Sequence, residues 1–236
     1  MLVRSYMSQP PILVAPDTSI SDALKTMRDR QIRRLPVVDG VGHLIGIVSD
    51  RDLLHAEPSP ATSLSVWEIT YLLARLTVQE VMTREVVTVH PDTPVEDAAQ
   101  LMCERKIGGL PVVDGDRVVG VITETDVFRI FTTLLGSQEP GIGITATVAD
   151  RIGLLADITR AIADAGGSVR AIATYPPSGG CGPARDARAS GAAAEPEAGP
   201  PAEQSIFVKV TGVPADELVT VVTPFVETVE EVRTGR

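Results

Sequence analysis

Leu35-Pro36-Val37-Val38-Asp39-Gly40 recurs unchanged as residues 110–115, and this repeat determines the architecture of the first half of the chain. Residues 7–40 align with residues 82–115 at a constant offset of 75, with 16 identities in 34 positions. Such self-similarity indicates two copies of one supersecondary unit. After the Asp-Gly pair the offset falls to 74, so the first copy has one extra residue there, as expected at the tip of a hairpin.

Each copy carries the signals for the order strand, helix, strand, strand, helix. Residues 16–18 and 91–93 both read Pro-Asp-Thr, a turn before a helix, with Thr18 or Ser19 and Thr93 as the expected caps. Apolar residues then recur at helical spacing, and two short apolar runs around Asp-Gly predict a β-hairpin. Because a three-stranded sheet cannot cover both of its faces alone, we expect the two copies to pack as a pseudo-twofold pair.

The chain is acidic and poor in aromatic residues. Its 236 residues include 21 Lys and Arg against 31 Asp and Glu, a net charge of −10, and 3% aromatics. Nucleic-acid binding needs clustered basic side chains and stacking platforms, so no nucleic-acid partner is expected. No apolar run approaches the roughly 20 residues of a membrane helix, and the first residues lack the apolar core of a signal peptide. With two cysteines that cannot form a disulfide framework, the sequence predicts a cytoplasmic protein without a membrane segment.

A second motif occurs once in each copy. Residues 46–52 read Gly-Ile-Val-Ser-Asp-Arg-Asp and residues 120–126 read Gly-Val-Ile-Thr-Glu-Thr-Asp, both fitting Gly-apolar-x-Ser/Thr-x-x-Asp. Together with the repeat, this motif resembles the CBS domain, and the tandem pair resembles a Bateman module. The resemblance extends to about residue 134. It implies a first CBS repeat at residues 1–56, a linker helix at 57–77 and a second CBS repeat at 78–134.

The motif places a carboxylate and a hydroxyl where they suit a nucleoside. A carboxylate accepts hydrogen bonds from both ribose hydroxyls, and a Ser or Thr three positions earlier can bond to the ribose or a phosphate. The resemblance implies ribose contacts from Asp52 with Ser49, and from Asp126 with Thr123. The alternative interpretation is structural: the hydroxyls cap helices, and the carboxylates lie in first turns that the helix dipole favours.

The phosphate end of the site differs between the copies. Arg33 and Arg34 in the first copy stand where the second has Gly108 and Gly109. The guanidinium fork suits phosphate, and the resemblance implies phosphate contacts from both arginines to AMP, ADP or ATP; a solvated surface pair is the alternative. We therefore expect one well-charged site, and a second that is weaker, empty or filled by a less charged adenosyl ligand such as S-adenosylmethionine. The residues expected around the adenine, or else in the plain core, are Ile12, Val14, Val87 and Val89.

Residues 57–77 carry helix signals between the copies. Ser65 and Glu68 fit a capping box, and apolar residues follow at helical spacing. We expect a helix that packs on the CBS pair or forms a dimer seam. The stretch also resembles the corresponding segment of proteins related to acetoin utilisation protein B, in which an ACT domain follows the CBS pair.

The last third of the chain has a βαββαβ pattern, and residues 141–236 resemble a ferredoxin-like ACT domain behind a linker at 135–140. The Asp-Arg-x-Gly-Leu-Leu turn at residues 150–155 supports the resemblance, although Ile152 stands where many members have proline. ACT domains commonly pair their sheets and bind small amino acids near this turn. The implied contacts are Asp150, Ile152, Gly153 and Leu154. A helix-entry turn without a ligand is the alternative.

Residues 176–204 interrupt this pattern. Of these 29 residues, six are Pro, five Gly and eight Ala, and none is Val, Ile, Leu or Phe. Such a segment cannot bury enough apolar surface to offset its ordering entropy, so a disordered insertion is predicted.

No motif in the chain indicates catalysis. The histidines His43, His55 and His90 lack metal-ligand spacing, and nucleophile, Walker and GxGxxG motifs are missing. No catalytic residue, catalytic cofactor or metal is therefore expected. The sequence predicts an α+β, homodimeric, non-catalytic regulator that binds an adenosyl ligand in the CBS-pair cleft, takes an amino acid at the ACT domain and acts on an unidentified metabolic enzyme. The alternative is a ligand-independent dimeric scaffold, or an accessory protein as in acetoin utilisation.

Overall fold

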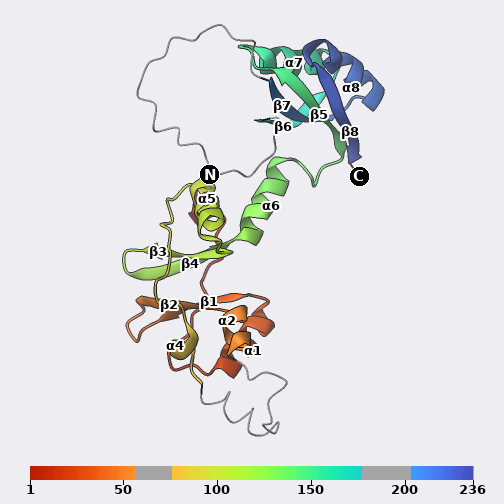
Figure 1. Cartoon of the computed structure of the whole chain (residues 1–236). Helices are drawn as coiled ribbons and strands as arrows, with labels where there is room; N and C mark the ends of the chain where they lie inside the picture. The colour runs from red at the N-terminus through yellow and green to blue at the C-terminus, as the bar shows by residue number, and fades with distance from the viewer. Residues whose placement is uncertain (57–75, 177–202, 236) are drawn as a thin grey trace, which may run out of the picture. The chain divides into compact units, whose positions relative to one another are not determined.

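The computed structural model describes residues 1–56, 76–176 and 203–235, and Figure 1 draws the remaining residues as a thin grey trace. The described residues form two compact units, Met1–Ile130 and Phe131–Arg236. The helix expected at residues 57–77 and the insertion expected at residues 176–204 lie almost wholly outside these ranges. Across the described ranges, no helix combines the length and the apolar character needed to cross a bilayer.

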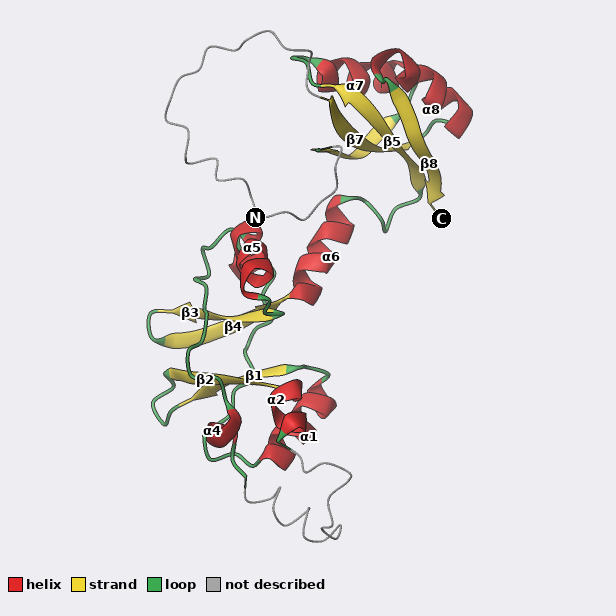
Figure 2. Cartoon of the chain, viewed as in Figure 1, coloured by secondary structure: helices red, strands yellow, loops and turns green. Residues whose placement is uncertain are grey.

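The first repeat contains helix α1 (Ile20–Arg30), strands β1 (Arg34–Val38) and β2 (Leu44–Ser49), and helix α2 (Asp50–His55). The two strands pair antiparallel as the predicted hairpin, as Figure 2 shows. The strand expected before α1 is reduced to one parallel bridge between Val14 and Val37. Ser19 caps α1, since its Oγ accepts a hydrogen bond from the backbone N–H of Asp22 at 3.1 Å.

The second repeat has the same elements: helix α5 (Val95–Arg105), strands β3 (Gly109–Asp114) and β4 (Arg117–Thr123), and helix α6 (Glu124–Leu134). Its own first strand is likewise a single parallel bridge, from Val89 to Val112. The prediction of Thr93 as a cap is wrong. Pro94 occupies the N-cap position of α5, and Thr93 Oγ1 instead accepts a hydrogen bond from the backbone N–H of His90 at 3.1 Å.

Each repeat lends a short segment to the other. Ser8, near the start of the first repeat, exchanges backbone hydrogen bonds of 2.9 and 3.2 Å with Val121 on β4 of the second. Thr83 does the same with Ile47 on β2, at 2.9 Å both ways. The short 3-10 helix η1 (Val3–Ser5) accordingly buries Val3 in the core of the second repeat. Helix α4 (Val78–Val81) and the following Met82 complete the core of the first.

The glycine of the Gly-apolar-x-Ser/Thr-x-x-Asp motif is required by this exchange. A Cβ on Gly46 would lie 2.4 Å from Sδ of Met82, and a Cβ on Gly120 would lie 2.5 Å from Sδ of Met7. Real Cβ atoms essentially never come that close to another heavy atom. The motif glycine therefore leaves the space in which the methionine of the lent segment packs.

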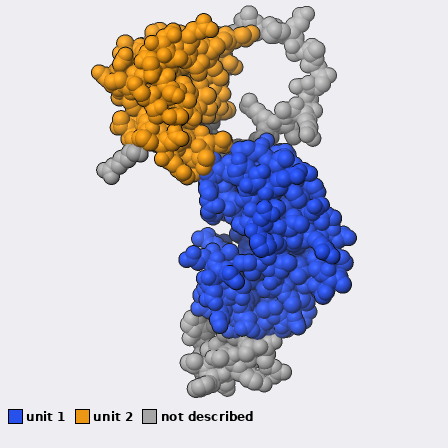
Figure 3. All heavy atoms as spheres, turned by 180° about the vertical axis from the view of Figure 1, so that it is seen from behind, with its two compact units in different colours: residues 1–130 blue, residues 131–236 orange. Residues whose placement is uncertain are grey.

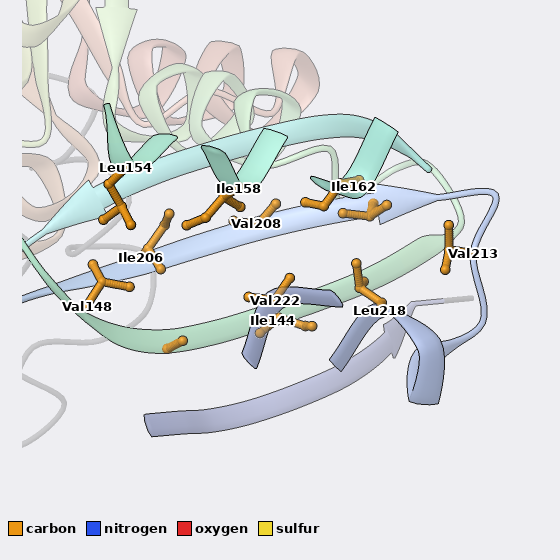
Figure 4. Packing of buried hydrophobic residues seen from close by; sticks show 12 residues of the cluster. Ile144, Val148, Leu154, Ile158, Ile162, Ile206, Val208, Val213, Leu218 and Val222 are labelled. Atoms are coloured by element: carbon orange, nitrogen blue, oxygen red, sulfur yellow. The ribbon is translucent and has the colours of Figure 1, made fainter. Parts of the chain in front are cut away.

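The C-terminal unit confirms the predicted βαββαβ order. Its elements are β5 (Gly141–Ala149), α7 (Leu154–Asp164), β6 (Ser168–Tyr175), β7 (Glu203–Thr211), α8 (Ala215–Val222), the 3-10 turn η2 (Thr223–Phe225) and β8 (Thr228–Gly235). The antiparallel sheet has the order β6-β7-β5-β8. Figure 4 shows side chains of α7 and α8, among them Ile158 and Leu218, pointing toward strand residues such as Ile206, which together form one aliphatic core.

One lysine is buried in this unit. Lys209 on β7 is 6% exposed, and its Nζ donates hydrogen bonds to the carbonyl oxygens of Gly136, at 2.5 Å, and Glu139, at 2.7 Å. A buried ammonium is tolerated only where such acceptors replace water. Lys209 therefore fixes the residues between α6 and β5 to the sheet.

Candidate functional site

A cavity of about 360 Å³, cavity A, lies at the end of β4. One wall comes from the second repeat and includes Thr123 and Asp126, and the opposite wall comes from the first repeat and includes Ile12, Arg33 and Arg34. In the space-filling view, the surface of residues 1–130 is hollowed on one side (Figure 3). The volume falls at the small end of the roughly 300–1,000 Å³ found for ligand sites.

A second cavity of about 300 Å³, cavity B, repeats this arrangement with the roles of the two copies exchanged. Ser49 and Asp52 of the first repeat form one wall, and Val87 and Gly109 of the second repeat contribute to the other. Each cavity thus joins the carboxylate and hydroxyl of one copy to the first-strand segment of the other. Arg33 consequently lines only the cavity of Asp126 and Gly109 only that of Asp52, while Arg34 and Gly108 line both.

Both motif carboxylates also hold helix starts. Oδ2 of Asp126 accepts hydrogen bonds from the backbone N–H of Thr123 at 2.9 Å and from its Oγ1 at 2.6 Å. Oδ2 of Asp52 accepts the same pair of bonds from Ser49, at 2.8 and 2.7 Å. The hydroxyl and the carboxylate of each motif therefore do take part in a helix cap, as the structural interpretation predicts. The same carboxylates line the cavities, and each has a second oxygen, Oδ1, which in Asp126 is 3.3 Å from Nη1 of Arg129.

Positive charge is present in both cavities. Arg33 is exposed and lines only the first of them, whereas Arg34 lines both and donates from Nη1 to the carbonyl oxygen of Gly108 at 3.0 Å. Cavity B also contains Arg51 and Lys106, which the sequence reasoning missed. The repeat could have indicated Lys106, because this residue aligns with Gln31 at the repeat offset. In the structure both residues end their helices with φ of 54°. Cavity B therefore contains cations, although the second repeat has glycines where the first has its arginine pair.

The four candidates for the adenine pocket divide into two pairs. Ile12 lines cavity A and Val87 lines cavity B. Val14 and Val89 line neither, because their parallel bridges hold them in the cores of the two repeats. Ile12 and Val87 are thus the two candidates that line the cavities, beside other apolar residues such as Ile32 in cavity A and Ile107 in cavity B.

The turn before α7 has the geometry of a helix entry. Gly153 caps the helix with φ of 87°, and Leu154 is buried in the core (Figure 4). Ile152 is fully exposed, and Oδ1 of Asp150 accepts a hydrogen bond from Gln204 at 3.2 Å. Of the four residues expected at this turn, Leu154 is thus part of the core, while the side chain of Ile152 is exposed. Over the described part of the chain, no three His, Cys, Asp or Glu side chains gather as metal ligands would.

Family models match the chain in two regions. The model of the CBS domain matches residues 3–59 and 78–132, and the model of the ACT domain matches residues 143–198. Both regions agree with the resemblances drawn from the sequence.

Two curated relatives differ in how much of their length is shared. An L-aspartate semialdehyde sulfurtransferase of Methanocaldococcus jannaschii is 38% identical over 133 residues, which make up 55% of this chain and 23% of that protein. A CBS domain-containing protein of Dictyostelium discoideum is 36% identical over 141 residues, 59% of this chain and 97% of that protein. The chain therefore spans less than a quarter of the sulfurtransferase and almost all of the second relative.

Two solved structures resemble the first half of the chain. One is a CBS domain pair in complex with 5′-methylthioadenosine and S-adenosyl-L-methionine, with 35% identity, a TM-score of 0.48, and coverage of 59% of this chain and 98% of that one. The other is a putative acetoin utilization protein of Vibrio cholerae, with 35% identity, a TM-score of 0.49, and coverage of 58% and 95%.

Proposed function

Because the chain belongs to the CBS domain family and carries an ACT domain behind its CBS pair, we propose that it is a non-catalytic sensor of an adenosyl ligand. CBS and ACT domains are regulatory modules, and cavities A and B are the binding sites in this proposal. Its domain division is the one expected from the sequence: residues 1–56, 57–77, 78–134, 135–140 and 141–236.

One observation carries the proposal: each cavity presents the three kinds of group that an adenine nucleotide needs. In cavity A, Asp126 offers a carboxylate oxygen to the ribose hydroxyls, Ile12 offers an apolar surface to the base, and Arg33 offers a guanidinium to a phosphate. Cavity B offers Asp52, Val87 and Lys106 for the same purposes. A ligand that binds one arrangement of the two repeats more tightly would shift the population toward it, which is how a sensor without chemistry transmits a signal.

The proposal extends to the rest of the molecule. An amino acid at the turn of Asp150 and Ile152 is the second ligand, two copies of the chain form the working dimer, and a metabolic enzyme receives the signal. The cytoplasm is the proposed compartment, because adenine nucleotides are abundant there.

Ligand binding to the purified full-length chain tests the proposal. We expect AMP, ADP, ATP or S-adenosylmethionine to raise the unfolding temperature. Asp126→Ala and Asp52→Ala should each weaken binding at one cavity by about 10- to 100-fold in calorimetry, the effect of losing hydrogen bonds to a charged group.

Asp22→Ala is the matched control. Asp22 accepts a hydrogen bond from Oγ of Ser19 at 2.7 Å, as the motif carboxylates do from their own capping residues, but it lines neither cavity. This variant loses the hydrogen bond from the Ser19 hydroxyl to the Asp22 carboxylate and should bind ligand normally. If none of the four compounds stabilises the folded protein, or if all three variants bind alike, the sensor proposal is refuted.

A scaffold that works without a ligand is the second candidate. It is favoured by the capping bonds of Asp52 and Asp126, which give both carboxylates a structural role that needs no ligand. A scaffold, like an accessory protein in acetoin utilisation, would capture its partner enzyme equally with and without nucleotide. Capture that changes with nucleotide would exclude the scaffold.

A further inference from the structure

We propose that Arg34 couples the two cavities, so that a phosphate-bearing adenosyl ligand in one weakens the binding of a second such ligand in the other. The inference rests on the proposed function, since it concerns ligands in the same two cavities. It adds a rule of occupancy: one phosphate-bearing ligand binds well, and the second ligand binds well only if it lacks the phosphate.

The geometry places one guanidinium between two sites. Among the described residues, only Arg34 and Gly108 belong to the walls of both cavities, and they are joined by the 3.0 Å hydrogen bond from Nη1 to the carbonyl oxygen. The shared wall is therefore a charged side chain of the first repeat lying on the backbone of the second. Five N–H donors belong to a guanidinium, and this bond uses one of them.

Gly108 leaves the space in which the ends of Arg34 and Glu124 lie. A Cβ on Gly108 would lie 2.5 Å from Nη2 of Arg34 and 2.7 Å from Oε2 of Glu124, whereas a Cβ on Gly109 would make an ordinary contact of 3.4 Å with Cδ of Arg34. Gly109 is also the residue that aligns with Arg34 at the repeat offset. Two arginines related by the pseudo-twofold would compete for this space and repel each other, so the pair of copies has one shared cation where full symmetry would give two.

A single guanidinium cannot serve two phosphates equally. The fork binds phosphate best in a bidentate geometry, which fixes the plane of the guanidinium toward one cavity. The second phosphate then has only the cations particular to its own cavity, which are Arg33 and Arg129 in cavity A, or Arg51 and Lys106 in cavity B. It also faces a shared cation whose charge is already neutralised. Ligands without a phosphate make no demand on Arg34 and should bind independently.

Calorimetric titration of the full-length chain with AMP and with adenosine tests the coupling. Asp52→Ala and Asp126→Ala first give the AMP affinity of each cavity with the other disabled. In the wild type, the second AMP should bind at least about tenfold more weakly than the weaker of these two affinities, the worth of one charged hydrogen bond. With adenosine, the wild-type curve should equal the sum of the two separate sites.

Two arginine variants separate coupling from simple phosphate binding. Arg34→Gln keeps a donor for the Gly108 carbonyl but removes the charge, so the extra weakening of the second AMP should disappear. Its unchanged adenosine affinity would show that the cavities are intact. Arg33→Gln, which affects one cavity only, should weaken AMP there and leave the extra weakening in place.

A wild-type AMP curve that equals the sum of the two separate sites would overturn the coupling while leaving the sensor proposal standing. Persistence of the extra weakening in Arg34→Gln would overturn it as well. Failure of both AMP and adenosine to bind would instead remove the proposed function on which the inference rests.

Discussion

Replacing the motif glycine of the first repeat tests the exchange of segments most directly. In Gly46→Ala the new Cβ would lie 2.4 Å from Sδ and 2.9 Å from Cγ of Met82, and 3.1 Å from the carbonyl oxygen of Thr83. The methionine side chain can turn away, but this carbonyl accepts the 2.9 Å bond from the N–H of Ile47 that holds the lent segment to β2. The segment itself must therefore move.

The expected cost follows from two opposing effects. Overpacking a well-filled core costs about 1–3 kcal/mol, whereas replacing glycine by alanine inside a strand gains about 0.5–1 kcal/mol. From the middle of each range, the net loss should be about 1 kcal/mol. For a unit of this size, that corresponds to a fall of roughly 3–6 °C in Tm.

Scanning calorimetry of the full chain measures this fall, with the C-terminal unit as an internal reference. Gly40→Ala is the matched control, because its Cβ would meet nothing within 4 Å; its Tm should stay the same or rise slightly. In a double-mutant cycle, Gly46→Ala with Met82→Ala should cost less than the sum of the single changes, since the smaller side chain relieves the overlap. Equal Tm values for Gly46→Ala and Gly40→Ala, or additive costs in the cycle, would refute the packing argument.

Two further predictions concern single side chains. Lys209→Met should destabilise the C-terminal unit by about 2–3 kcal/mol in urea unfolding, because two carbonyls lose a charged donor. Replacing the exposed Lys25 by Met should change the stability little. Equal effects of the two changes would contradict the role of Lys209 as a buried donor. The hydrogen bond from the backbone N–H of His43 lowers the pKa of the Asp39 carboxyl below its usual 3.8. The ionised carboxylate therefore stabilises the fold above pH 3.8, and this stabilisation is lost as the pH falls through the lowered pKa. Asp39→Asn should therefore unfold at a lower temperature than wild type at pH 7, and the gap should close in acid; a gap that stays constant with pH would contradict the assignment.

Local pattern was sufficient to predict most of the fold. Short apolar runs on either side of Asp39-Gly40 and of its repeat predicted both hairpins, and helical spacing predicted α1 and α5. The C-terminal βαββαβ order followed from the same signals. These elements are predictable because their turns and apolar faces are encoded within a few residues of one another.

The contacts between the copies were not predictable from local pattern. Nothing near Val3 or Met82 indicates that each enters the core of the other repeat, since a duplicated sequence fits either core equally well. For the same reason the sequence could not say which carboxylate faces Arg33. The role of Gly108 as space for Arg34 depends on a contact between residues 74 positions apart, which propensity and periodicity do not report.

The reciprocal lending of η1 and α4 has an evolutionary consequence. A single-copy ancestor could satisfy the same contacts only by trading its leading segment with a second polypeptide, as domain-swapped dimers do. Gene fusion would then have turned an intermolecular exchange into a covalently tethered one. Once tethered, the halves no longer had to be identical, and the lone guanidinium of Arg34 opposite Gly109 is a difference that no homodimeric precursor could have encoded.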